Sequence, residues 1–372
     1  MRIVFLGNGM TGYLDAQYRE LHQLGHELMV VQPDSPEAAV AAMRDTAFGD
    51  LGTGTYAEFL GWQDSPRPDV LTKQVLEFDP DAVVMTAWNF AKAYRAVMKA
   101  VPAEVVRILV MDNLWRSTPR QWLGRAVHRW YIDTVADAAM VPSDRSEFYA
   151  HRLGFGAADV IRGSLTADTG IFFTPPRSGE DMASRRSFLF VGRLVDHKGA
   201  DLLAEAYARY RRADSDPWDL HVVGMGPLGP MLAGLDGVTM HGFLPPVAVA
   251  ALMREASGYL LPSHIEPYGV AVHEAAASGL PILCSDFAGV APGLVQDGAN
   301  GWIVPAGDVD LWVAAMTRMS SLSSVRLAAM SEISLALSRR ISPSIWAHNL
   351  QDEIGRRRAA GGGRLTRQTS SR

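Results

Sequence analysis

Residues 188–199 read FLFVGRLVDHKG, an apolar run that ends at a glycine and is followed by charged residues and a second glycine. The first four residues have the length and composition of a buried strand, and residues 200–211 have a helical pattern. A strand, a glycine-containing loop and a helix in this order are typical of the βα unit of a parallel sheet. The same order recurs on both sides of this stretch.

Two series of such units run along the chain. The first predicts strands at 3–6, 27–31, 82–86, 105–111 and 138–141, with helices at 12–24 and near 36–44. The second predicts strands at 188–191, 220–223, 238–240, 258–261 and 281–284, with helices at 200–211, 247–255 and 270–278. Since 372 residues are many for one core, the expected fold class is α/β, with two Rossmann-like doubly wound domains facing a ligand-binding cleft.

Four segments are expected from this pattern. They are an N-terminal domain over 1–175, a C-terminal domain over 176–340, a final helix over 341–357 that packs back on the N-terminal domain, and a disordered basic tail over 358–372. The stretch 174–180 resembles an interdomain linker. The stretch 45–69, rich in glycine and proline, interrupts the first series and is expected to form a surface loop or lid.

Composition limits the class of protein. With 48% hydrophobic and 20% charged residues the chain has an ordinary globular composition, and its formal net charge of −5 argues against a nucleic-acid-binding protein. The single cysteine, Cys284, lies in an apolar run and is expected in the core. No leader pattern or membrane-spanning apolar run is recognisable, so the expected location is the cytoplasm.

Two cations follow the strand at 188–191. Gly192 and Arg193 come at its end, and Lys198 lies five residues beyond Arg193 at the entrance to the next helix. A guanidinium fork together with an ammonium can hold both phosphates of a diphosphate at the carboxyl edge of a parallel sheet. The alternative is a pair of solvated surface cations.

Two further strands end in turns. Gly224 follows one of them, and Phe243 and Leu244 follow the next, where the backbone can bracket a flat nucleobase. The alternative is that both are ordinary βα turns.

Residues 262–281, PSHIEPYGVAVHEAAASGLP, place two carboxylates eight residues apart on a strand, loop and helix. Glu266 in the loop can reach into the cleft, and Glu274 on the helix can accept hydrogen bonds from paired hydroxyls such as those of ribose. The alternative is one surface acid and one acid at a helix start.

This segment resembles the retaining glycosyltransferases of family four, which have the GT-B fold. Their hallmark E-P-F-G-x-x-x-x-E-A-x-A-x-G-x-P is matched from Glu266 to Pro281, V-G-R-L-x-x-x-K-G is matched over 191–199, and d-G-x-n-G-x-l-v-p-x-g-d is matched over 297–308. The resemblance covers about 185–310. There are departures: the acid of G-G-x-x-E is missing, since the chain reads AGVAPG over 288–293, and LTADT over 165–169 stands where N-G-V-D is usual.

The resemblance implies site residues and an activity. Arg193 and Lys198 would hold the donor diphosphate, Glu266 would lie beside the transferred sugar and Glu274 would bind ribose. The other expected donor contacts are Gly192, Gly224, Phe243, Leu244, Tyr268, Gly269 and Val270, and residues 286–290 would offer backbone amides to the sugar or the phosphates. The expected activity is retaining transfer from a UDP-sugar, with GDP possible, to a carbohydrate, lipid-linked or protein acceptor. Two alternatives stay open: a nucleotide-sugar epimerase or phosphorylase, and a non-catalytic subunit that binds sugar nucleotides.

The first domain carries a weaker signal, GNGMTG over 7–12. Gly9, Met10 and Gly12 can serve close packing or the acceptor, contact a donor phosphate, or, with Asp34, form an NAD site. Asp112 and Asn113, after the strand at 105–111, are the candidate acceptor contacts.

No essential metal or cofactor is expected. Three D-x-D triplets, at 79–81, 214–216 and 308–310, lie at turns, and the ten histidines show no ligand spacing.

The stretch 115–130 interleaves arginines with tryptophans on a predicted helix. It can rest on an anionic membrane surface, or it can bury its tryptophans and leave only its arginines in water.

Overall fold

The computed structural model describes residues 1–33, 56–62, 67–86 and 92–361. They form two compact units, one of Met1–Thr166 with Pro343–Arg372 and the other of Ala167–Ser342. The chain therefore passes from the first unit to the second upstream of the stretch 174–180, and it returns at Pro343.

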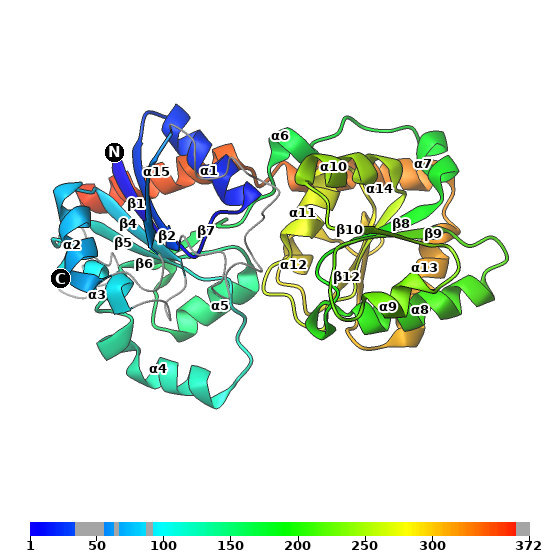
Figure 1. Cartoon of the computed structure of the whole chain (residues 1–372), viewed down its shortest axis with the longest axis horizontal. Helices are drawn as coiled ribbons and strands as arrows, with labels where there is room; N and C mark the ends of the chain where they lie inside the picture. The colour runs from blue at the N-terminus through cyan, green and yellow to red at the C-terminus, as the bar shows by residue number, and fades with distance from the viewer. Residues whose placement is uncertain (34–55, 63–66, 87–91, 362–372) are drawn as a thin grey trace. The chain divides into compact units, whose positions relative to one another are not determined.

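The first unit is built on a seven-stranded parallel sheet in the order β3-β2-β1-β4-β5-β6-β7 (Figure 1). Its strands are β1 (Arg2–Leu6), β2 (Glu27–Pro33), β3 (Glu58–Trp62), β4 (Ala82–Thr86), β5 (Val106–Val110), β6 (Ala138–Val141) and β7 (Val160–Arg162). Its helices are α1 (Gly12–Gln23), α2 (Pro68–Glu77), α3 (Lys92–Ala100), α4 (Pro119–Tyr131), α5 (Asp144–Arg152) and α15 (Pro343–Ala359), with a short turn η1 (Ala157–Asp159).

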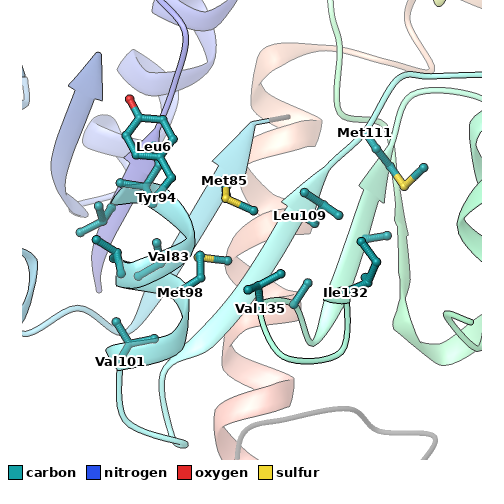
Figure 2. Packing of buried hydrophobic residues seen from close by; sticks show 14 of the residues in the cluster. Leu6, Val83, Met85, Tyr94, Met98, Val101, Leu109, Met111, Ile132 and Val135 are labelled. Atoms are coloured by element: carbon teal, nitrogen blue, oxygen red, sulfur yellow. The ribbon is translucent and has the colours of Figure 1, made fainter. Parts of the chain in front are cut away.

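Successive side chains of each strand point to opposite faces of this sheet. Helices cover both faces, so there is a hydrophobic core on each side. Val4 and Leu6 of β1 lie in the core under α2, α3 and α5, where Figure 2 shows Leu6, Val83 and Met85 against Tyr94 and Met98. The alternate residues of β1 lie in a second core with side chains of α1 and α15.

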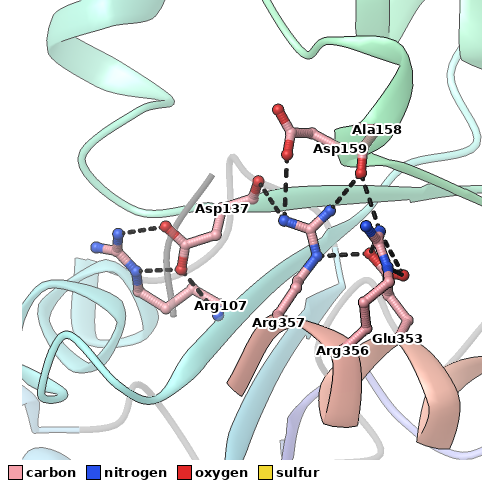
Figure 3. A network of polar contacts seen from close by, with 7 residues as sticks. All are labelled: Arg107, Asp137, Ala158, Asp159, Glu353, Arg356 and Arg357. Atoms are coloured by element: carbon pink, nitrogen blue, oxygen red, sulfur yellow. Dashed lines mark hydrogen bonds and ion pairs between the residues drawn. The ribbon is translucent and has the colours of Figure 1, made fainter. Parts of the chain in front are cut away.

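Helix α15 packs beside α1 and is fixed to the same unit by a buried arginine. The guanidinium of Arg357, 0% exposed, pairs with Asp159 (3.2 Å) and Glu353 (2.6 Å) and donates to the carbonyl oxygen of Ala158 (2.8 Å) (Figure 3). Removal of one partner of a buried ion pair is strongly destabilising, because the remaining charge is then neither paired nor hydrated. The last turn of α15 is thereby held against the start of β7.

The second unit has a six-stranded parallel sheet in the order β10-β9-β8-β11-β12-β13. Its strands are β8 (Ser187–Val191), β9 (Asp219–Val223), β10 (Val238–Gly242), β11 (Gly258–Leu261), β12 (Ile282–Ser285) and β13 (Gly301–Val304). Its helices are α6 (Thr169–Phe172), α7 (Gly179–Arg185), α8 (Ala200–Ala213), α9 (Gly229–Ala233), α10 (Pro246–Glu255), α11 (Val270–Ala277), α12 (Ala291–Leu294), α13 (Val309–Ser320) and α14 (Ser324–Ser338), with a short turn η2 (Asp196–Lys198).

The predicted fold class, two Rossmann-like parallel α/β domains, is confirmed, while the cleft between them stays a prediction. The strands predicted at 82–86, 138–141 and 258–261 have those bounds, and Cys284 is buried as expected. The prediction of a loop over 45–69 was partly wrong. Part of the stretch 45–69 is not loop, because Glu58–Trp62 pair with β2 as an edge strand. The helix predicted near 36–44 and residues 362–372 of the predicted tail lie outside the described residues.

Candidate functional site

The candidate site lies where the strand order of the second sheet reverses. Strand β8 has β9 on one side and β11 on the other, and all of these strands run parallel. The loops after β8 and β11 therefore leave the same edge in opposite directions, which opens the crevice where α/β sheets bind ligands.

The loop after β8 is held by its neighbour after β9. The N–H of Gly192 donates to Val223 O (2.9 Å) and that of Leu194 donates to Met225 O (2.9 Å). A Cβ at Gly224, whose φ is +137°, would lie 1.9 Å from Gly192 O, so only glycine permits this approach. Between these bonds, the Arg193 side chain is exposed while Leu194 is buried.

The loop after β8 also meets the loop after β11. Gly199, with φ +68°, ends the turn η2 and starts α8, and a Cβ there would lie 2.1 Å from Pro262 O. The close approach brings Lys198 to the residues that follow β11. Lys198 was expected at a helix entrance, and the structure places it at the end of η2, next to Gly199, the N-cap of α8.

Lys198 contacts Glu266 directly: its Nζ donates to the carboxylate Oε2. The side chains are 21% and 8% exposed, so the pair is largely shielded from water. The Glu266 backbone is fixed by the loop after β12, because its N–H donates to Phe287 O (3.3 Å) and its carbonyl accepts from Gly289 N–H (3.0 Å). Lys198 and Glu266, which were predicted as separate site residues, thus form one ion pair.

A histidine joins the cations. Nη2 of Arg193 donates to Nε2 of His197 (3.4 Å). The pKa of His197 is lowered by burial and by the nearby charges of Lys198 and Arg193, so the ring is neutral at pH 7 and accepts from Arg193. No role was predicted for His197 from the sequence. Its position beside Lys198, in the loop that carries both cations, could have indicated that it belongs to the site.

Glu274 lies on α11, which begins after Gly269 (φ +104°). Tyr259 of β11 is buried, and its pKa is raised well above the usual value by burial and further by the charges of Glu274 and Glu266. Its hydroxyl donates to Val191 O (3.4 Å) at the end of β8. Both carboxylates are therefore near one tyrosine at the carboxyl edge of β8 and β11.

Helix α11 is anchored by a neutral histidine. His273 is fully buried; its Nδ1 accepts from Ala167 N–H (2.9 Å) and its Nε2 donates to Ser338 O (3.0 Å). Burial lowers the pKa of His273 to about 4. The helix that carries Glu274 is in this way tied to α14 and to the first residue of the unit.

Apolar side chains surround the same edge. Phe243 after β10, Phe287 after β12 and Met225 after β9 are exposed, and Leu244 is half-buried. The turn that precedes Phe243 is joined to Gly224 by the bond from Gly224 N–H to Gly242 O (2.7 Å). The exposed rings of Phe243 and Phe287 offer apolar surface on which a planar base could stack.

The residues after Glu266 are less accessible. Tyr268 and Gly269 are buried, and Val270 is half-buried. Among the described residues the Tyr268 hydroxyl has no hydrogen-bond partner, and burial raises its pKa.

The amides expected from 286–290 are already used. The N–H groups of Asp286, Phe287, Ala288, Gly289 and Val290 donate to Val304 O, Ser285 Oγ, Ser285 O, Glu266 O and Tyr268 O. These bonds position Glu266 and leave none of the five amides to a ligand in this structure. At Gly293, where the family's acid is missing, a Cβ would meet nothing within 4 Å.

The predicted residues of the first unit fall into two places. Gly9 (φ +132°) precedes α1, Gly12 is its first residue, and the Met10 side chain is buried in the core. Asp112 and Asn113 follow β5, half-buried and exposed respectively. Asp34, on which the NAD alternative depends, lies outside the described residues.

Among the described residues, no three His, Cys, Asp or Glu side chains are grouped as a metal site. Carboxylates of the D-x-D triplets form hydrogen bonds with the backbone. Asp81 accepts from Arg2 N–H (2.7 Å), and Asp308 caps the N-terminus of α13. None of the described helices is both long and apolar enough to cross a membrane.

Comparison with known proteins finds a family match in the second unit. Residues 185–321 match the family described as Glycosyl transferases group 1, so the second unit carries a domain of this kind. The D-inositol 3-phosphate glycosyltransferase of Geodermatophilus obscurus is 32% identical over 265 residues, which are 56% of this chain and 58% of that protein. The chain thus spans little more than half the length of this relative.

Two solved structures share the fold. Anabaena Alr3699/HepE in complex with UDP and glucose aligns over 95% of this chain and 99% of its own, with a TM-score of 0.72 and 17% identity. Sucrose-phosphate synthase from Thermosynechococcus elongatus aligns over 97% and 100%, with a TM-score of 0.74 and 15% identity. The chain has the two Rossmann-like domains of GT-B glycosyltransferase structures.

Proposed function

We propose that this chain is a retaining glycosyltransferase that moves a sugar from a nucleoside diphosphate sugar to a hydroxyl group of an acceptor. The observation that carries the proposal is the contact of Lys198 with Glu266 at the switch point, with Arg193 beside it. We assign the two cations to the diphosphate and the carboxylate to the adjoining sugar. The match of 185–321 to Glycosyl transferases group 1 supports the same function.

In the proposed reaction the bond from the anomeric carbon to the β-phosphate oxygen breaks and negative charge builds on the diphosphate. Arg193 and Lys198 stabilise that charge, which lowers the barrier because the charge is larger in the transition state than in the bound donor. Neutral His197 holds the Arg193 guanidinium without adding a competing charge.

Glu266 steadies the positive centre that develops on the sugar. Its backbone is fixed by bonds to Phe287 and Gly289, so the carboxylate is positioned before the donor binds. The acceptor hydroxyl attacks from the face of the leaving group, and a phosphate oxygen takes its proton, which retains the configuration. Glu274 binds the ribose hydroxyls.

We propose UDP as the base-carrying part of the donor, with GDP as the second choice, because Alr3699/HepE was solved with UDP and glucose. Phe243 and Leu244 after β10 are the proposed contacts of the base. The acceptor, a carbohydrate, a lipid-linked saccharide or a protein, is assigned to the first unit, with Asp112 and Asn113 as its proposed contacts.

The test is calorimetric titration with UDP, GDP and ADP, followed by a panel of donors carrying the base that binds best. We expect one diphosphate to bind and its sugar to be transferred with retained configuration, measured by NMR of the product. Transfer is expected to persist in EDTA, since no metal is required by the proposal.

Three outcomes would count against the proposal. Failure of all three diphosphates to bind would show that the proposed donor site does not bind a nucleoside diphosphate. Conversion of the sugar in the absence of any acceptor would indicate an epimerase. Binding of a diphosphate without transfer or hydrolysis of any donor would indicate a non-catalytic subunit.

A further inference from the structure

Helix α4 forms from its own local sequence. The Thr118 hydroxyl accepts from Gln121 N–H (3.4 Å), and the Gln121 side chain accepts from Thr118 N–H (3.3 Å). Pro119 occupies the first helical position. This reciprocal cap defines where the helix begins.

The helix is attached to the first unit by a narrow inner side. Gly124 is its one buried residue. The Arg95 guanidinium stacks on Tyr131 (3.5 Å) on this side, whereas Trp122, at the border of the outer side, meets Trp115 edge to face (5.2 Å between ring centres). Figure 1 shows α4 at the outer edge of the first unit, with α5 between it and the strands.

The outer side of α4 is apolar. Trp122, Ala126 and Trp130 recur every four residues and share one face, with Leu123 next to it. Trp122, Leu123 and Trp130 are 48%, 63% and 76% exposed. The expectation of buried tryptophans is therefore wrong for Trp122 and Trp130.

The apolar face extends onto α5. The Arg152 guanidinium lies over both Trp122 (5.7 Å) and Phe148 (4.6 Å), so the two rings flank one cation. Phe148 is 49% exposed. Large apolar side chains from two helices thus form one exposed patch, which in a folded protein marks an interaction surface.

Cations flank this face. Arg125 and Arg129 lie along one side of the apolar arc and Arg120 along the other, and residues 113–132 contain no acid. Within the part of the chain that the structure describes, these three arginines take part in no ion pair. An apolar face between unpaired arginines complements a bilayer interface, where acyl chains lie beneath anionic headgroups.

We propose that α4 docks this protein on the surface of an anionic lipid bilayer, with Leu123, Trp130 and Trp122 entering the interface and Arg120, Arg125 and Arg129 contacting headgroup phosphates. The helix lies in the plane of the surface, since it is amphipathic and no described helix can cross a membrane. The docking does not depend on the proposed sugar transfer.

Flotation with vesicles tests the apolar face. The protein should float with phosphatidylcholine vesicles that contain about a quarter phosphatidylglycerol, and not with pure phosphatidylcholine. Leu123→Ser with Trp130→Ser should lower the partition coefficient by more than about tenfold, because both side chains leave the interface. The matched control is Leu311→Ser with Val325→Ser, two exposed apolar residues of the second unit, which should float like the unchanged protein.

Salt and charge test the arginines. Arg125→Gln with Arg129→Gln should lower the partition coefficient about 30-fold, since each cation near an anionic surface contributes about 1 kcal/mol, or about fivefold. About 1 M salt should release the unchanged protein, because screening then acts within about 3 Å. The control is Arg212→Gln with Arg340→Gln, two exposed arginines elsewhere.

Unaltered thermal unfolding of the four double variants shows that each is folded. The proposal fails if the unchanged protein does not float with anionic vesicles at low salt, or if Leu123→Ser with Trp130→Ser floats equally well. It also fails if the unchanged protein is a dimer that does not float and this variant is a monomer, because the face would then join two copies of the chain.

Discussion

Replacement of Glu266 by Gln should strengthen the binding of UDP. The Glu266 carboxylate forms an ion pair with the ammonium of Lys198, and the two side chains are 8% and 21% exposed. A diphosphate that binds Lys198 must share it with this carboxylate. The amide has the same shape but carries no charge, so it removes the competition and keeps the packing.

The magnitude follows from the geometry of one ammonium between two anions. A phosphate and a carboxylate that share it lie about 6 Å apart and repel by roughly 3 kcal/mol at an effective dielectric constant of about 20. Water and counterions reduce this, because Lys198 is partly exposed. A gain of about 1–2 kcal/mol, or about 5- to 30-fold in affinity, is expected.

Calorimetric titration with UDP measures this gain at neutral pH. The matched control is Asp196→Asn, which removes an exposed negative charge from the same loop and should change the affinity less than about twofold. Sugar transfer by Glu266→Gln should fall by about 100-fold or more, since the carboxylate next to the sugar is lost. Equal or weaker binding of UDP by Glu266→Gln would refute the competition.

Other changes test the remaining parts of the site. Arg193→Ala should weaken UDP about 10-fold or more in the same titration and should leave uridine binding unchanged, because the guanidinium holds only the phosphates; an equal loss for uridine would contradict this. Gly224→Ala should lower the unfolding temperature, as its Cβ would lie 1.9 Å from Gly192 O, whereas Gly293→Ala meets nothing within 4 Å and serves as control; equal temperatures would contradict the close approach. For His273, whose pKa falls from 6.5 to about 4, the unfolded chain binds a proton that the native protein does not between these values. Stability should therefore decline as the pH falls from 6.5 to 4, by at most about 3 kcal/mol, in urea unfolding. His273→Gln should have a smaller decline, and an unchanged pH dependence would show that His273 does not cause it.

Much of the second unit was predictable because its inner strands β8, β11 and β12 are buried on both faces and appear in the sequence as short apolar runs. The strand at 258–261 was placed to the residue, and Glu266 and Glu274 were placed on the loop and helix that follow it. Strand β3 was missed since Glu58–Trp62 form a partly exposed edge, where neither alternation nor a continuous apolar run is required. Its pairing with β2 alone defines it.

The sequence by itself determined the kinds of residue at the site: Arg193 and Lys198 after one strand, Glu266 after another, and a helix over 115–130 with tryptophans and arginines. It could not determine which of them meet. Lys198 and Glu266 are 68 residues apart and touch because β8 and β11 are neighbours in the sheet, an order that no local pattern encodes. Likewise Trp130 is of a residue type that is common in cores. It is 76% exposed because α4 packs on the first unit through the side that carries Gly124, which the sequence alone does not show.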